Sequence, residues 1–214
     1  MTDARFADAW EAAEWLVSPA VERRRRGLAA LTASDRLGSS PLLLHLLVSR
    51  LAEPDLELRC SIVVNLARCL YPTSTITPGL QAAREQLAEL LKGCDRKHVE
   101  WLLEADIGPA ETDRYRRVQR PALILLDRVP NLGGTLTRIA ADRSAPMPTR
   151  AAAARALGEL GVVEALPALE GLKTRIAGQS AGQVAMAFAP RSEPGEQQLL
   201  EALKSSIEML LDDE

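Results

Sequence analysis

The sequence predicts an all-α fold, and three observations support this prediction. Of its 214 residues, 47% are hydrophobic but only 3% are aromatic, so the core must consist mainly of Leu, Ala, Val and Ile, which suits closely packed helices. The stretch "TRAAAARALGELGVVEALPALEGL" (149–172) spaces its apolar residues as on one face of a helix. Similar helical segments recur at intervals of about 30 to 35 residues, which is typical of stacked helix pairs.

The stretch 149–172 predicts the start of two consecutive helices. Gly161 is expected to end the first, because glycine commonly follows the C-terminus of a helix. Since the turn is short, we expect the two helices to pack against each other in antiparallel orientation. The apolar positions are Ala153, Ala156, Leu157 and Leu160 in the first helix and Val163, Leu166, Leu169, Leu172 and Ile176 in the second.

An arginine near the start of a helix marks the repeat. Arg24, Arg59 and Arg150, here called the marker arginines, are each followed seven residues later by a leucine and preceded within a few residues by a proline. Arg24 and Arg59 are 35 residues apart, and Arg59 and Arg150 are 91 apart, which is close to three further steps. The segment 94–142 is less regular, and Arg117 is a weaker candidate for a further marker.

The segment "SSPLLLHLLVSRLAEPD" (39–55) predicts a second helix after the first marker helix. Ser40 is placed to cap its N-terminus, and Pro41 suits the first helical turn. The segment is apolar nearly all round, which is typical of a helix buried on several sides. We therefore expect His45 to be a hydrogen-bonded core histidine.

The two ends of the chain predict capping helices, which a repeat array needs because its last repeats otherwise expose an apolar face. Their expected core faces are Phe6, Trp10, Ala13 and Val17 at the N-terminus and Leu199, Leu203, Ile207 and Leu210 at the C-terminus. We expect one domain, 1–214, divided into an N-terminal capping helix (1–18), helical repeats (19–177), a Gly- and Ser-rich flexible loop (178–195) and a C-terminal capping helix (196–212).

The residues "PTRAAAARALGELGVVEALPALEGL" (148–172) resemble a HEAT repeat of the bilin-lyase-like type. That pattern has an arginine, a run of alanines, "LG-x-LG", and a second helix with leucines and an early proline, which Pro167 matches loosely. The resemblance covers 148–175, and 19–52 and 54–92 resemble more divergent copies. It implies an armadillo-type, right-handed α-solenoid of about four to five antiparallel helix pairs that binds other proteins along its second-helix face. Such a resemblance indicates shape better than activity.

The resemblance implies a non-catalytic protein-interaction, scaffold or adaptor module, and we expect no cofactor. A net charge of −3 gives no general attraction to nucleic acid. The longest apolar run, "PLLLHLLV", is too short to span a membrane, and the acidic, amphipathic N-terminus is unlike a secretory signal. We therefore expect a cytoplasmic protein that binds a protein partner or itself, with no membrane contact.

Two other functions remain open. The resemblance implies as one alternative a bilin-lyase-like or chaperone-like protein that acts on a pigment-bearing partner. The other is nucleic-acid binding through an arginine-rich face, which predicts a steeply salt-dependent affinity that is lost when Arg114, Arg117 and Arg120 are replaced.

Departures from the repeat pattern supply the candidate partner-binding residues. Trp15 lies about 140° around the helix from Trp10, so it either packs on the following helix or is an exposed anchor. The arginines of 22–26 and 114–120 form either a solvated, salt-bridged face or a basic patch. Two apolar residues of the predicted loop either fold back or order on binding. The candidates are Trp15, Arg114, Arg117, Arg120, Met186 and Phe188.

No motif predicts a catalytic or metal site. "GQSAG" (178–182) matches the nucleophile elbow of hydrolases, but helix precedes it in our interpretation and both histidines precede Ser180, so a flexible loop is favoured. Cys94 and His98, with Asp95, make at best half of a zinc site, and a structural thiol with a surface imidazole is the favoured interpretation. Three cysteines do not indicate a disulfide framework.

Overall fold

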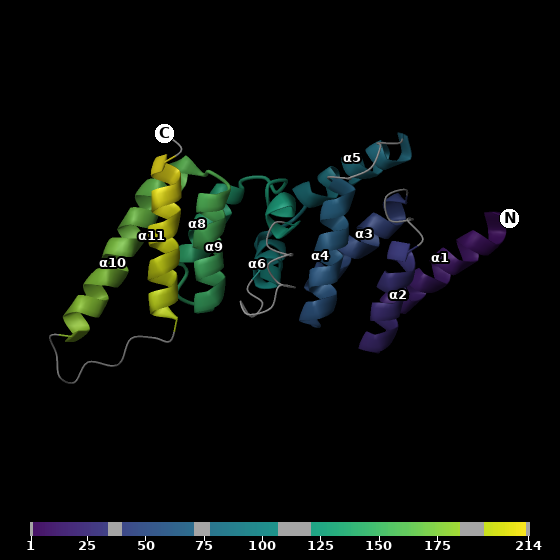
Figure 1. Ribbon diagram of the computed structural model, residues 1–214, viewed down its shortest axis with the longest axis horizontal. Helices are drawn as coiled ribbons and strands as arrows, with labels where there is room; N and C mark the ends of the chain where they lie inside the picture. Colours follow the sequence, from purple (N-terminus) through teal and green to yellow (C-terminus); the bar gives the residue numbers. More distant parts are fainter. Residues whose placement is uncertain (1, 34–39, 71–77, 107–120, 185–194, 213–214) are drawn as a thin grey trace. The chain divides into compact units, whose positions relative to one another are not determined.

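The computed structural model describes residues 2–33, 40–70, 78–106, 121–184 and 195–212 (Figure 1). Every regular element among them is helical, and none is a strand, so the predicted all-α class is confirmed. Residues 121–126 are also helical. The elements are α1 (Thr2–Leu16), α2 (Val21–Ala33), α3 (Pro41–Ser49), η2 (Arg50–Ala52), α4 (Leu56–Leu70), α5 (Pro78–Lys92), α6 (Arg96–Asp106), α8 (Leu132–Ala141), α9 (Met147–Glu159), η3 (Val163–Ala165), α10 (Leu166–Val184) and α11 (Glu196–Asp212).

The chain divides into two compact units, Met1–Val129 and Pro130–Glu214. The single solenoid domain stays a prediction, and each unit is described by itself below. One boundary differs from expectation, because α10 continues to Val184. The first part of the expected loop, 178–184, is therefore helical, and most of its remainder lies outside the described residues.

In the N-terminal unit, the helices form two rows. One row consists of α2, α4 and α6, in which α4 contacts both of its neighbours. In the other row α3 packs on α5, but α1 packs on α2 and makes few contacts with α3 among the described residues. The leucines seven residues after Arg24 and Arg59, Leu31 and Leu66, are completely buried between these rows. The row of α1, α3 and α5 is thus closed at one end and open between α1 and α3.

The buried face of α1 is not the predicted one. Trp10 and Val17 are 52% and 55% exposed, whereas Ala12 and Leu16 are buried. Around the helix the buried face is rotated by about 110° from the predicted stripe. The cause lies on α2, where a Cβ at Gly27 would come within 2.6 Å of the Ala12 carbonyl oxygen. Only a small residue at position 27 permits this close approach. Helix α1 therefore turns the face of Ala12, and not that of Trp10, towards α2.

In the C-terminal unit, α9 packs mainly on α8 and α11, and α10 packs on α11. The prediction that α9 and α10 pack against each other is therefore wrong, because these two helices make few contacts with each other among the described residues. Gly161 does end α9, with φ of 64°, and the Val162 and Gly161 amides donate to the Leu157 and Gly158 carbonyls as in a Schellman motif. After this turn η3 contacts both α8 and α10, and the alanine face of α9 is covered by α8 and α11. The predicted core face of α11 is confirmed, since Leu199, Leu203, Ile207 and Leu210 are all buried.

Helices α9 and α11 approach closely where both carry a small residue. A Cβ at Gly158 would lie 2.7 Å from the Cα atom of Ser206. The Ser206 hydroxyl donates to the Ala154 carbonyl at 2.8 Å, which ties the two helices together at this point. The contact therefore has room for a hydrogen atom on Gly158 and not for a methyl group.

We expect Gly158→Ala to lower the free energy of unfolding by about 1–3 kcal/mol, because the added methyl group must push α11 away. The matched control is Gly171→Ala in α10, where an added Cβ meets no atom within 4 Å. That substitution should stabilise the helix by roughly 0.4–1 kcal/mol. Urea unfolding followed by circular dichroism measures both, and equal stability of the two variants would contradict the close approach of α9 and α11.

Candidate functional site

The marker arginines share a structural role. They are the arginines that are buried among the described residues. Each donates to a backbone carbonyl near the end of the preceding helix or turn: Arg24 to Ser18 and Pro19, Arg59 to Glu53, and Arg150 to Ala140, at 2.7 to 3.0 Å. Carbonyls at helix C-termini lack partners within the helix. The arginine at the start of one helix therefore satisfies the end of the one before it, which explains why the spacing recurs.

Glu53 is the centre of a charge cluster that also includes Arg24 and Arg50. Its carboxylate is only 1% exposed and accepts hydrogen bonds from Arg24 Nε at 3.0 Å and Arg24 Nη2 at 2.6 Å. Arg50 and the Asp55 amide donate to the same carboxylate. Since Arg59 binds the Glu53 carbonyl, this residue connects α2, η2 and α4. Sequence reasoning missed Glu53, although its position between two marker helices, just before α4, was the available signal.

The environment of Glu53 lowers its pKa. Burial alone raises the pKa of this carboxyl, but the hydrogen bonds from Arg24, the Asp55 amide and Arg50 outweigh burial, and the net shift is downward. The pKa of Asp55 is also lowered. Burial raises this pKa, but the hydrogen bonds from the Leu58 amide and Arg25 outweigh burial, so the net shift is downward. Both carboxylates are therefore charged at neutral pH in the folded protein.

The arginine run 22–26 is partly neutralised by these acids. Arg24 is bound to Glu53, and Arg25 contacts Asp55 at 2.9 Å and Glu57 at 3.1 Å. Arg23 and Arg26 are exposed. Two of the four arginines are thus engaged in ion pairs, as the salt-bridged interpretation of this run predicts.

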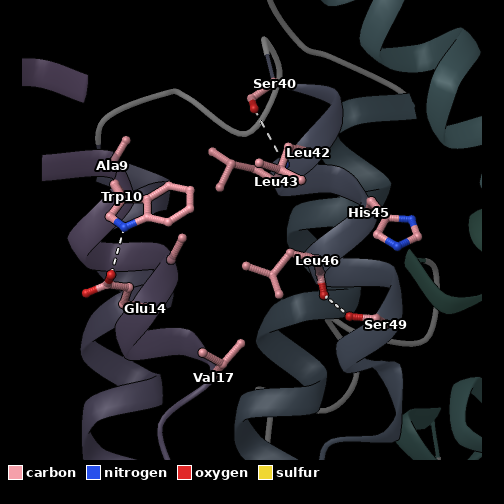
Figure 2. Close-up of a pocket in the computed structure, with 11 residues that line it drawn as sticks. Ala9, Trp10, Glu14, Val17, Ser40, Leu42, Leu43, His45, Leu46 and Ser49 are labelled. Atoms are coloured by element: carbon pink, nitrogen blue, oxygen red, sulfur yellow. Dashed lines mark hydrogen bonds between the residues drawn. The ribbon is translucent and has the colours of Figure 1, made fainter. Parts of the chain in front are cut away.

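An apolar groove of about 450 Å³ lies between α1 and α3 (Figure 2). One wall is formed by Ala9, Trp10 and Ala13 of α1 and by Val17, the residue that follows this helix. The other wall is formed by Leu42, Leu43 and Leu46 of α3. The polar residues that line it are Glu14, Ser40, His45 and Ser49.

Three large apolar side chains from the two walls gather at this groove. Trp10, Val17 and Leu42 are 52%, 55% and 64% exposed, and the other exposed large apolar residues of the described chain are Val163 and Leu211. Scattered apolar residues are normal on a surface, but a cluster that faces a groove indicates a binding site.

Local interactions fix both walls of the groove. On α1, the Trp10 indole Nε1 donates to Glu14 at 2.7 Å, one turn further on (Figure 2). On α3, Ser40 caps the helix by accepting from the Leu43 amide, and Pro41 occupies the first turn, as the sequence predicts. Both walls therefore consist of regular helix with ordered ends.

The structure corrects two predictions about α3. This helix buries Leu43, Leu44, Leu47 and Val48, which lie on one broad face, and leaves Leu42 exposed, so it is not buried on several sides. His45 is exposed, and its ring points away from Trp10 at the edge of the groove (Figure 2), so it is not a core histidine. The physical reason is that α1 packs on α2 and leaves this side of α3 uncovered.

Of the candidate partner-binding residues, only Trp15 lies in the described chain. It is half-buried, and its Cβ would lie 3.0 Å from a Cβ at Gly27, so it lies beside the contact between α1 and α2. The other candidates fall outside the described residues: Arg114, Arg117, Arg120, Met186 and Phe188. Trp15 is not among the residues that line the groove described above.

The motifs considered as a possible hydrolase site and a possible zinc site lie in or next to ordinary helices. "GQSAG" (178–182) lies within α10, whose helical backbone is not the strand–turn–helix of a nucleophile elbow. Asp95 accepts from the His98 amide at 3.1 Å and lies 2.7 Å from its Nδ1, at the start of α6. Burial, with the charge of Asp95, raises the pKa of the Cys94 thiol to about 11, which keeps it protonated. The described residues contain no group of three or more His, Cys, Asp or Glu side chains arranged to hold a metal ion.

Comparisons with known proteins add no relative, since no family model, curated protein or solved structure matches the chain. The HEAT resemblance therefore stays a prediction. None of the described helices is both long and apolar enough to cross a membrane.

We expect Glu53→Gln to lower the free energy of unfolding by about 3–5 kcal/mol at neutral pH, because it leaves the buried Arg24 without its counter-charge. Glu89→Gln is the matched control, since its ion pair with Lys92 is exposed and should contribute less than about 1 kcal/mol. Chemical denaturation measures both variants.

The same variant tests the pH dependence. The pKa of Glu53 is lower in the folded than in the unfolded chain, so its contribution is fully present above about pH 4.3 and is lost as the pH falls through the lowered pKa. Unfolding measured between neutral and acid pH should therefore show a smaller loss of stability in Glu53→Gln than in the wild type. An unchanged pH profile would show that Glu53 is not held in its charged form by the cluster.

Proposed function

We propose that the protein is a cytoplasmic, non-catalytic interaction module that binds a protein partner in the groove between α1 and α3. The observation that supports this most directly is the clustering of Trp10, Val17 and Leu42, which are more than half exposed and lie on the two walls of one groove. Tryptophan is among the residues that most often dominate the binding energy of protein interfaces.

A protein partner fits this groove better than a small molecule. Small-ligand sites usually enclose 70–90% of their ligand, with a few polar groups that fix its orientation. Here Trp10, Val17 and Leu42 are each more than half exposed to solvent, so the groove is open along its rim. An open apolar groove between two helices is the usual shape of a site that receives one face of another helix.

The repeat architecture supports the same proposal. Counted from the marker arginines on α2 and α4, the second helices are α3 and α5, and these pack side by side. The groove lies beside this second-helix row, which is where the HEAT resemblance predicts protein binding. The shared hydrogen bonds of Arg24, Arg59 and Arg150 also favour an origin of these segments as copies of one unit.

Affinity capture from the source cells tests the proposal, with the amount of each captured protein measured by quantitative mass spectrometry. The variant is Leu42→Glu, which places a charge in the groove. The matched control is Leu211→Glu, because Leu211 is an exposed leucine at 50% on α11, in the other unit. We expect Leu42→Glu to lose at least one protein that both the wild type and Leu211→Glu retain. If Leu42→Glu captures the same proteins in the same amounts as the control, the groove is not the binding site.

A further inference from the structure

We infer that the groove receives a basic amphipathic helix of the partner protein. The inference rests on the proposed function and adds the chemistry of the occupant: its secondary structure, its apolar face and the sign of its charge.

The packing of the N-terminal unit indicates a helical occupant. In the row of second helices, α3 lies against α5, whereas α1 makes few contacts with α3 and the groove separates them. Packed helices have axes 8–10 Å apart, so a helix placed between α1 and α3 would continue this row. The small side chains of Ala9 and Ala13 on the α1 wall give a partner helix room to approach the backbone.

The spacing of the anchors also suits a helix. Trp10, Ala13 and Val17 lie at i, i+3 and i+7 along α1, and Leu42 and Leu46 lie at i and i+4 along α3. The α1 anchors span about 10 Å, which is close to two helical turns. A partner helix with apolar residues at the same intervals would place its apolar side chains between those of the two walls.

The charge of the walls indicates a basic occupant. Glu14 lines the groove on α1 and is exposed, and residues 9–17 and 40–49 include no Lys or Arg. The next cation along the chain after these residues, Arg50, is bound to Glu53. The described lining therefore carries a carboxylate and no Lys or Arg, and a flank of Lys or Arg on the partner helix would complement this charge.

The same charge argues against a second copy of this chain as the occupant. In a two-fold dimer whose axis passes through the groove, Glu14 of one copy would be brought near Glu14 of the other. Like charges brought together at an interface disfavour association. A basic helix encounters no such repulsion.

Two designed peptides test the inference on the full chain. Both are amphipathic, about 15 residues long, with leucine at i, i+3, i+4 and i+7, and the remaining positions are Lys in one and Glu in the other. We expect fluorescence anisotropy to show that the Leu/Lys peptide binds at least about tenfold more tightly than the Leu/Glu peptide. Leu42→Ala should weaken the binding of the Leu/Lys peptide about tenfold, and the matched control Leu211→Ala should leave it unchanged. The charge reversal Glu14→Lys should reduce the preference for the Leu/Lys peptide.

Two outcomes would overturn the inference. One is equal binding of the two peptides, or a preference that Leu42→Ala and the charge reversal leave unchanged. The other is a dimer in sedimentation velocity that Leu42→Glu abolishes, which would make a second copy the occupant. Neither outcome removes the proposed function, which fails only if captured proteins do not depend on Leu42.

Discussion

The buried carboxylate of Glu53 is the interaction on which the N-terminal unit depends. Removing a charged carboxylate from water costs several kcal/mol unless donors replace the water. Here Arg24 binds it through two nitrogens, and Arg50 and the Asp55 amide supply further donors. Because Arg24 also binds the carbonyls of Ser18 and Pro19, the cluster reaches the turn that follows α1. Arg50 lies directly after α3. Both walls of the groove are therefore connected to one buried charge, which fixes where they lie.

A structural feature could be predicted from the sequence where its physical cause lies in residues close to it along the chain. The marker arginines and their leucines were predictable because each pair lies on one helix, and the arginine at its start reaches the end of the preceding one. Gly161 was predictable for the same reason, since a left-handed residue after a helix depends on the local backbone. The partner of Arg24 was harder to predict, because Glu53 lies 29 residues away and only its position just before a marker helix distinguishes it from the other acids.

The prediction of the core face of α1 was wrong because the apolar stripe did not decide how this helix packs. Phe6, Trp10, Ala13 and Val17 form the stronger apolar stripe, and apolar spacing is the main signal of a core face. The packing was decided instead by Gly27 on α2, which admits Ala12 and Leu16 at close range. The sequence of α1 alone does not show that this helix packs against Gly27 of α2. The prediction that His45 is buried was also wrong, since α1 packs on α2 and does not cover this side of α3.

That error also explains the candidate site. An apolar stripe on a helix marks a surface that must leave water, but it does not say whether the cover comes from the same chain. After α1 packs on α2, Trp10, Ala13 and Val17 of this stripe line the groove opposite Leu42 and Leu46 of α3. Keeping each of the large side chains exposed costs on the order of 1 kcal/mol. Because the charge cluster holds both helices in place before a partner arrives, binding orders little of the chain, and much of that cost is recovered as affinity.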